Sequence, residues 1–356
     1  MEGIRHWFAR NFSDPQVVLL AVLLALGIGV IVFFGDLLAP VLAGLVIAYL
    51  LDAPTQVLKR RGVPHLAAVT LVFLGFMALS AFALLSVVPL LSNQVGQLVF
   101  ALPSMVSDVN DLLLGLPERF PQFIETDQVS EAVASIRVEL LKSGQQLVAF
   151  SWDRLGNVVT LLVYAFLVPM TVFFFLKDKE EILAWFGNYL PKERGLVRQV
   201  AGEMNRRSGD YVRGKAYEIL IVTVVSLTTF WALGLRFAML LALLSGLSVL
   251  VPYIGVAVVA VPVTLVALFQ FGTTGAFFVV IGAYAIIQVL DGNLLAPLLL
   301  SEVVNLHPIA VVVAILIFGG IWGFWGLFFA IPLATLADCV LRAWPSSHAD
   351  TPEEPA

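Results

Sequence analysis

The sequence predicts an all-α integral membrane protein, and three observations support this fold class. Of the 356 residues, 60% are hydrophobic and only 13% are charged, and the mean hydropathy is +0.96. A soluble domain of this length would need more charge to cover its surface. Apolar runs recur along the chain at about the 20 residues that a transmembrane helix requires, giving about eight hydrophobic blocks. These runs are unbroken rather than alternating, which excludes the strands of a membrane β-barrel.

Three membrane helices are predicted within residues 1–91, with apolar segments at 17–34, 37–51 and 66–91. The first segment is longer than the apolar part of a signal peptide, which spans about 7–15 residues, so we interpret it as an uncleaved membrane helix. Basic side chains flank these helices, and such side chains concentrate in cytoplasmic loops. We therefore expect the N-terminus and the connection between the second and third helices to be cytoplasmic. The flanking residues are Arg5, Arg10, Lys59, Arg60 and Arg61.

Residues 92–151 are predicted to form extracytoplasmic amphipathic helices. Acidic side chains outnumber basic ones here, as a translocated loop tolerates. Apolar side chains recur at helical spacing from Val95 to Leu113, a turn is predicted at 116–121, and a second helix is predicted to follow Thr126. Two interpretations stay open: the helices lie on the bilayer surface, or they form contacts between subunits.

A fourth membrane helix is predicted in residues 152–176, with its apolar run at 158–176. Residues 177–215 are rich in lysine and arginine and are again amphipathic, which favours cytoplasmic helices interrupted at Pro191. Arg342 indicates that the C-terminus is cytoplasmic as well. The tail, residues 345–356, is polar, acidic and contains proline, which is typical of a disordered segment.

Residues 216–344 form the predicted C-terminal core, with apolar runs at 216–233, 237–271, 276–290 and 309–341. The second and fourth runs are too long for one ordinary span, and glycine and proline interrupt each of them. Paired interrupted segments indicate a transport site built on an inverted repeat. We favour two re-entrant or broken helices over two kinked ordinary helices packed through glycine. The predicted break and hinge residues are Pro252, Gly255, Pro262, Pro297, Gly320, Gly323, Gly326 and Pro332.

Several function classes lack their motifs in this sequence. It contains no GxxxxGK[ST] phosphate loop, no HExxH and no CxxC, so we expect no enzyme, no metal and no cofactor. Cys339 is the single cysteine, which excludes an intramolecular disulfide and favours packing as a small apolar side chain. No basic run indicates nucleic acid, and the net charge is −5. The expected surroundings are the lipid bilayer.

The main candidate site lies between the two interrupted runs. Asp291 ends the apolar run 276–290, and a carboxylate near membrane depth costs about 2.5–3.5 kcal/mol on insertion scales, so it usually has a function. We hypothesise that Asp291 binds a proton or a cation together with neutral oxygen donors. The alternative is that Asp291 and Gly292 end the helix in water at the interface. The candidate substrate- or ion-binding residues are Gln288, Asp291, Asn293, Glu302, Asn305 and Tyr253.

A second group of polar residues enters the run 216–233 from the predicted cytoplasmic side. Tyr211, Lys215 and Glu218 are candidate gate residues. Glu218 stands one helical turn after Lys215 and could pair with it or with Arg213. The alternative is that these charges snorkel toward water at a helix end.

Six sequence stretches resemble the autoinducer-2 exporter superfamily. They are FFFLKDKE at 173–180, YVRGK at 211–215, VLVPYIG at 249–255, QVLDGNLLAP at 288–297, VNLHP at 304–308 and FGGIWGFWGLFFAIPLATL at 318–336. The resemblance covers nearly the whole chain and implies a bacterial inner-membrane exporter of small polar solutes. It further implies a homo-oligomer, with a pentamer as one candidate assembly, and relatives have also been linked to sodium/proton exchange. Many relatives carry glutamate at the place of Asp291 and glutamine at the place of Lys215, which argues against a direct substrate role for Lys215.

From the residues and the resemblance together we expect a secondary transporter, a permease that exports a small solute with coupling to protons or sodium. One alternative is a monovalent cation/proton antiporter. Another is a non-transporting scaffold for envelope machinery, which would use residues 92–151 as its docking surface.

Overall fold

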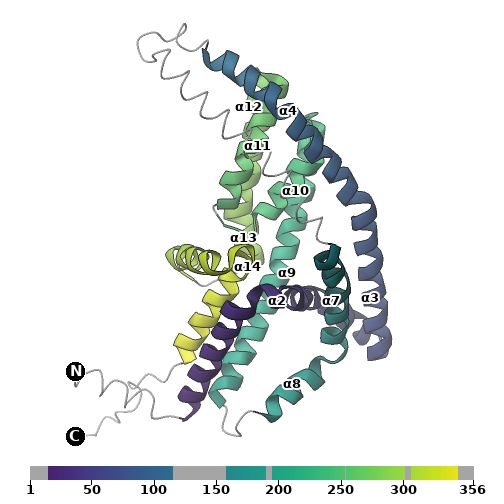
Figure 1. Ribbon diagram of the computed structural model, residues 1–356, viewed down its shortest axis with the longest axis vertical. Coiled ribbons are helices and arrows are strands. Elements are labelled where there is room, and N and C mark those ends of the chain that lie inside the picture. Colours follow the sequence, from purple (N-terminus) through teal and green to yellow (C-terminus); the bar gives the residue numbers. More distant parts are fainter. Residues whose placement is uncertain (1–14, 115–157, 190–194, 253, 301–305, 344–356) are drawn as a thin grey trace, which may run out of the picture. The chain divides into compact units, whose positions relative to one another are not determined.

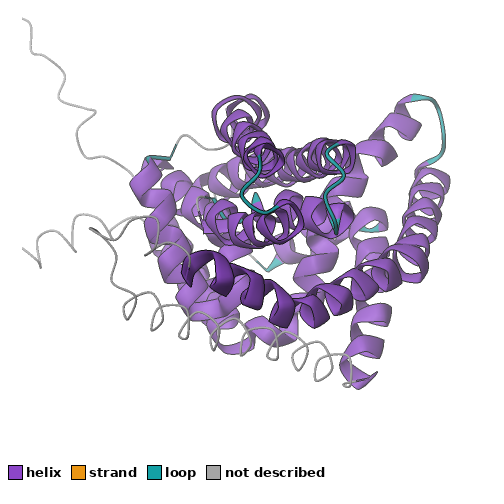
Figure 2. Ribbon diagram, turned by 90° about the horizontal axis from the view of Figure 1, so that it is seen from above, coloured by secondary structure: helices purple, strands orange, loops and turns teal. Residues whose placement is uncertain are grey.

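The computed structural model describes residues 15–114, 158–189, 195–252, 254–300 and 306–343, and this part of the chain is helical apart from short connections (Figures 1 and 2). Within these residues, seven helices are long and apolar enough to cross a membrane, or eight if one bent pair counts as a span. The predicted all-α membrane fold is confirmed. The chain divides into two compact units. Unit 1 consists of Met1–Thr70, Leu167–Gly214 and Leu300–Ala356, and unit 2 consists of Leu71–Phe166 and Lys215–Leu299.

The first two predicted membrane segments lie in one continuous helix, α2 (Pro15–Arg60). It contains two candidate spans, Gln16–Gly35 and Leu37–Arg60, and its ribbon changes direction between them (Figure 1). Two separate helices were predicted here, with a break near Gly35. In the structure Gly35 instead allows the Trp322 side chain to lie close to α2, because a Cβ at residue 35 would overlap the Trp322 indole. The second segment also continues past residue 51, where it was predicted to end, to the basic residues Lys59 and Arg60.

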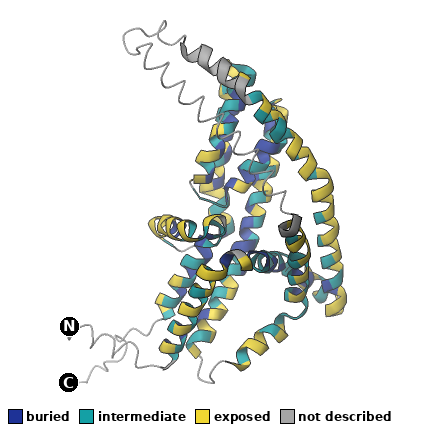
Figure 3. Cartoon of the chain, viewed as in Figure 1, coloured by how far each residue is buried: buried dark blue, intermediate teal, exposed yellow. Residues whose placement is uncertain are grey.

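The third membrane segment continues without a loop into the first predicted amphipathic helix. Helix α3 (His65–Phe82), the π-helical turn η1 (Ala83–Val87) and α4 (Val88–Leu114) follow one another directly. Most large apolar side chains of α3 and η1 are exposed, as expected of a lipid-facing helix (Figure 3). Leu98 and Ala101 of α4 instead pack on the core of unit 2, so part of this amphipathic face is covered within the chain. The predicted turn at 116–121 and the helix after Thr126 lie outside the described residues.

The fourth membrane segment ends in a sharp bend. Helix α7 (Val158–Lys177) is followed after Asp178 by the short helix α8 (Lys179–Asn188), and the two axes differ by 81°. The predicted cytoplasmic amphipathic segment is helical on both sides of residues 190–194. These five residues, which include the predicted interruption at Pro191, lie outside the described part of the chain. Helix α9 (Gly195–Ala232) joins the end of this segment to the fifth membrane segment without interruption.

The first overlong apolar run folds into a helical hairpin. Helix α10 (Ala238–Ser248) is too short to cross a membrane, and helix α11 (Ile254–Phe271) follows it. Leu241 of α10 shares a buried cluster with Val266 of α11, although these residues lie on opposite sides of the break. Gln270 then joins the two ends, because its Oε1 accepts from the Arg236 amide and its Nε2 donates to the Gly234 carbonyl, both at 2.7 Å. This run is therefore a hairpin and not one kinked helix.

Helix α12 (Gly275–Leu290), the π-helical turn η2 (Asp291–Leu295) and α13 (Ala296–Leu300) complete unit 2, and Pro297 lies in α13. The second overlong run is α14 (Pro308–Ala343). It is interrupted where it was predicted to break, because Trp322 and Gly323 leave the helical region and Gly323 has a φ of 55°, a conformation that favours glycine. In unit 1, Cys339 of α14 is buried with Leu20 and Val200, as expected for a small apolar side chain.

Candidate functional site

The candidate site begins with an ion pair on α9, inside unit 2. Lys215 Nζ lies 2.8 Å from Glu218 Oε2, and the two side chains are only 7% and 2% exposed. Of the two partners that the sequence offered for Glu218, the structure shows Lys215, whereas Arg213 pairs with Asp210 at 2.6 Å. Burying two charges is costly even when they are paired. A snorkelling lysine would expose its ammonium to water, and Lys215 does not.

The break of the α10–α11 hairpin supplies a third group. Lys215 Nζ donates a hydrogen bond of 2.9 Å to the carbonyl oxygen of Val249, the residue that ends α10. The last carbonyls of a helix have no partner within it and carry partial negative charge, so they attract cations. Val249 is buried with Val222 of α9 and Ile287 of α12, and Leu295 of η2 packs against them. One apolar cluster therefore brings the break, α9 and the α12–η2 junction together.

Close packing of backbones holds this break in place. A Cβ at Gly246 would overlap the side chain of Thr223 on α9, and a Cβ at Gly255 would overlap the Ser248 backbone. Glycine at these two positions allows α10 to lie against α9 and α11 to begin directly over the end of α10. The predicted break residue Gly255 thus lies at the break, and Pro262 lies farther along inside α11.

Asp291 lies at the junction of α12 and η2 and is 7% exposed. The chain continues there as a helix, so Asp291 is not at a water-exposed turn. It lies within electrostatic range of both Glu218 and Lys215. Its Oδ1 is buried and makes no hydrogen bond to any residue that the structure describes. A buried carboxylate oxygen without a partner is costly, and it is a binding group for a proton or a cation.

The other candidate residues differ in where the structure places them. Both amide atoms of Gln288, one turn before Asp291, are buried without a hydrogen bond of standard geometry among the described residues. Asn293 is exposed, and its Nδ2 donates to its own helix at Val289 O, 2.9 Å away. Tyr211 is buried on α9 one turn before Lys215. Tyr253, Glu302 and Asn305 lie outside the described residues.

Two groups of the site, the Val249 carbonyl and the Tyr284 hydroxyl, could not be identified from the sequence. The Val249 carbonyl is a backbone group, so only the predicted helix break could have pointed to it. Tyr284 of α12 was not a candidate, but its hydroxyl donates to the Val256 carbonyl of α11 at 2.9 Å and so ties α12 to the hairpin. An aromatic residue in an apolar run does not reveal such a partner.

The second break, in unit 1, has a related local geometry. A Cβ at Gly326 would overlap the carbonyl of Phe318, just as one at Gly255 would overlap Ser248. The predicted break residue Gly320 is helical and has open space around it, and Pro332 lies in the helix after the break. No charged residue of the described chain is buried at this break, so the paired breaks differ in chemistry.

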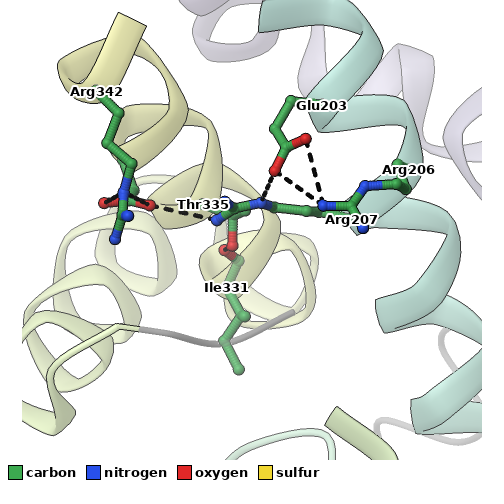
Figure 4. Close-up of polar contacts among 7 residues, drawn as sticks. Glu203, Arg206, Arg207, Ile331, Thr335 and Arg342 are labelled. Carbon is green, nitrogen blue, oxygen red and sulfur yellow. Dashed lines mark hydrogen bonds and ion pairs between the residues drawn. The ribbon is translucent and has the colours of Figure 1, made fainter. Parts of the chain in front are cut away.

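Unit 1 also contains an ionic network between α9 and α14 (Figure 4). Arg207 Nε lies 2.6 Å from Glu203 Oε1, and Arg207 Nη1 lies 3.3 Å from Asp338 Oδ2. Arg342 completes it at 2.8 Å from Asp338. This partly exposed network joins two helices and has no unpaired buried carboxylate, so we interpret it as structural.

The fold and the buried charges define a multi-pass α-helical membrane protein with a polar site inside its helices. The AI-2E family transporter model matches residues 20–346, and the chain belongs to this family. The expected family is confirmed, and with it the class of membrane transport proteins.

Relatives in three bacteria match most of the chain. It is 44% identical over 351 residues to "Putative permease PerM" of Escherichia coli K12, covering 98% of this chain and 99% of that protein. It is 28% identical to "Putative transport protein YrrI" of Bacillus subtilis, covering 82% of each chain. It is 29% identical to "Putative transport protein MT0215" of Mycobacterium tuberculosis, covering 89% of this chain and 85% of that protein.

Proposed function

We propose that the chain is a secondary transporter that exports a small solute and uses the buried cluster on α9, α10 and η2 as its coupling site. The observation that carries this proposal is the buried Oδ1 of Asp291, which has no hydrogen-bond partner in the described part of the chain and lies within electrostatic range of the Lys215–Glu218 pair. A charged cluster among membrane helices costs folding free energy and usually marks an ion or substrate pathway. Broken helices beside such charges are typical of transporters, where free carbonyls contribute to the site.

The proposal includes a location and an assembly. We place the chain in the bacterial inner membrane with both termini cytoplasmic, because Arg5, Arg10 and Arg342 flank the membrane segments. We also propose a homo-oligomer, as family membership suggests. Fusions of alkaline phosphatase or a fluorescent protein to the C-terminus test the orientation. Fluorescence without phosphatase activity supports it, and phosphatase activity contradicts it.

Reconstitution tests the transport function with a mixture of solutes in place of one chosen solute. Proteoliposomes are loaded with the small-molecule fraction of the host cell, a proton or a sodium gradient is imposed, and exported compounds are identified by mass spectrometry. We expect at least one compound to leave vesicles with the native chain faster than protein-free vesicles. The matched variants are Asp291→Asn, which removes the carboxylate charge, and Asn293→Ala, which removes an amide that hydrogen-bonds to Val289 of its own helix.

Each outcome separates the proposal from its alternatives. Export that requires a gradient and Asp291 supports a coupled exporter. Ion exchange without any exported organic compound, measured with a trapped pH dye, supports the cation/proton antiporter instead. If neither compounds nor ions move, the transport proposal is contradicted and the scaffold alternative gains support.

A further inference from the structure

The surroundings of the Lys215 ammonium match those of a bound cation. Its Nζ is 2.8 Å from the Glu218 carboxylate and 2.9 Å from the Val249 carbonyl at the end of a broken helix. Carboxylate oxygens and carbonyls at unwound helix ends are the ligands that broken-helix transporters offer to Na⁺ or H⁺. Lys215 is only 6% exposed, so its ammonium lies inside the protein, as a bound ion would, and not at the surface.

The charge of the cluster adds a second constraint. With all three side chains ionised, the Lys215 ammonium contacts the Glu218 carboxylate and lies within electrostatic range of the Asp291 carboxylate, so the three charges sum to one negative charge. The other titratable group on this face of α12 is Tyr284, whose hydroxyl is bound to Val256. Asp291 Oδ1 is buried and unpartnered within the described chain. A single positive charge bound at Asp291 therefore neutralises the cluster.

We propose that Lys215 is a tethered cation that fills a monovalent-cation site formed by Glu218, Val249 and Asp291, so that the exchangeable ion of the native chain is a proton on Asp291 and not sodium. The inference rests on the proposed function and specifies its coupling ion. A proton needs only the free oxygen of Asp291. A sodium ion needs several oxygen ligands at once, and Lys215 holds two of those available. The step is a simple protonation, in which Asp291 gains one proton from one side and releases it to the other.

The test removes the tethered cation and asks whether sodium replaces it. The full-length protein in detergent is unfolded by heat in sodium chloride or in choline chloride at equal ionic strength. The Lys215→Ala variant removes the ammonium and opens space, whereas Lys215→Met removes the charge but fills the space. We expect sodium to raise the unfolding midpoint of Lys215→Ala saturably, by about 3 °C or more, because a ligand that binds only the folded state stabilises it. The native chain and Lys215→Met should show no sodium-specific rise.

A second substitution confirms the place of binding. Adding Glu218→Gln to Lys215→Ala removes a carboxylate ligand, and we expect the sodium effect to disappear. A sodium-specific rise in the native chain, or none in Lys215→Ala, overturns the proposal.

Should Lys215→Ala fail to fold, flux through the native chain decides the question. We expect a proton gradient to drive export in proteoliposomes and a sodium gradient alone to leave it unchanged. Export driven by sodium alone overturns the proton assignment but leaves secondary transport standing. Absence of export under both gradients contradicts the proposed function. Thermal unfolding in sodium chloride then still tests the cation site. A sodium-specific rise of the unfolding midpoint in the native chain or in Lys215→Met overturns it, and no rise in both proteins supports it.

Discussion

Gly255 lies so close to the Ser248 backbone that a Cβ at residue 255 would overlap the Ser248 carbonyl oxygen. This contact places the start of α11 over the end of α10 and fixes the break at which the Val249 carbonyl meets Lys215. The obstacle is backbone, which cannot move aside as a flexible side chain can. The geometry of the site thus depends on the absence of one methyl group.

The Gly255→Ala substitution should therefore destabilise the protein. We expect the free energy of unfolding to fall by about 1–3 kcal/mol, the usual cost of overpacking, because two backbone segments must separate. Thermal unfolding of the full-length protein in detergent measures the change. Gly282→Ala in α12 is the matched control, since its added Cβ meets open space and alanine favours a helix by up to about 1 kcal/mol. Equal stability of the two variants would show that the close approach is not rigid.

The break in α14 gives a parallel pair of variants. Gly326→Ala should lower the free energy of unfolding by about 1–3 kcal/mol, because its Cβ would overlap the Phe318 carbonyl. Gly320→Ala adds a methyl group in open space and should leave the midpoint of thermal unfolding unchanged or raised. A larger loss in Gly320→Ala than in Gly326→Ala would contradict the observed packing.

Glu218→Gln tests the burial of the Lys215–Glu218 pair. The substitution breaks the 2.8 Å contact and leaves Lys215 with the more distant Asp291 carboxylate as its counter-charge. Breaking a buried pair costs about 3–5 kcal/mol. The double variant Lys215→Met/Glu218→Leu should recover most of this loss, because both charges leave and Asp291 can take up a proton. Unfolding midpoints of the native, single and double variants give the comparison. A single variant as stable as the native chain would mean that water reaches the pair.

The ionic network of Figure 4 allows a comparison within one helix. Arg207 pairs with both Glu203 and Asp338 and has a side chain only 14% exposed, whereas the ion pair of Arg206 among the described residues is with Glu203 and its side chain is 58% exposed. Arg207→Met should lower thermal stability more than Arg206→Met, which should change it by less than about 1 kcal/mol, as is usual for an exposed pair. The reverse order would indicate that α9 and α14 are not joined through Arg207.

The sequence predicted the fold where hydrophobicity and backbone chemistry act locally. Long apolar runs indicated the membrane helices, and Pro252, Gly255 and Gly323 marked the breaks, because glycine and proline favour local departures from helical geometry. It did not predict the continuity of α2 past Gly35, where the glycine accommodates Trp322 from far along the chain. Such a contact is decided by tertiary packing, and a glycine that permits a turn looks the same as one that permits a close approach.

The candidate site was predictable in part for the same reason. A carboxylate at the end of an apolar run pointed to Asp291, and the spacing of Lys215 and Glu218 on one helix face made their pairing one of the open possibilities. Nothing in the sequence indicated that the Val249 carbonyl would receive the ammonium, because every residue has a carbonyl and only folding leaves one free. The amide of Asn293 resembled a ligand in the sequence, but in the structure it binds its own helix.

The central claim is that Asp291 couples transport to an ion gradient, and the most direct measurement is gradient-driven export by proteoliposomes with the native chain or Asp291→Asn. Asn293→Ala serves as the matched control two residues away. We predict that a proton gradient accelerates export by the native chain and by Asn293→Ala, and that Asp291→Asn loses this acceleration. Export by Asp291→Asn at the native rate, with the same dependence on the gradient, would contradict the account.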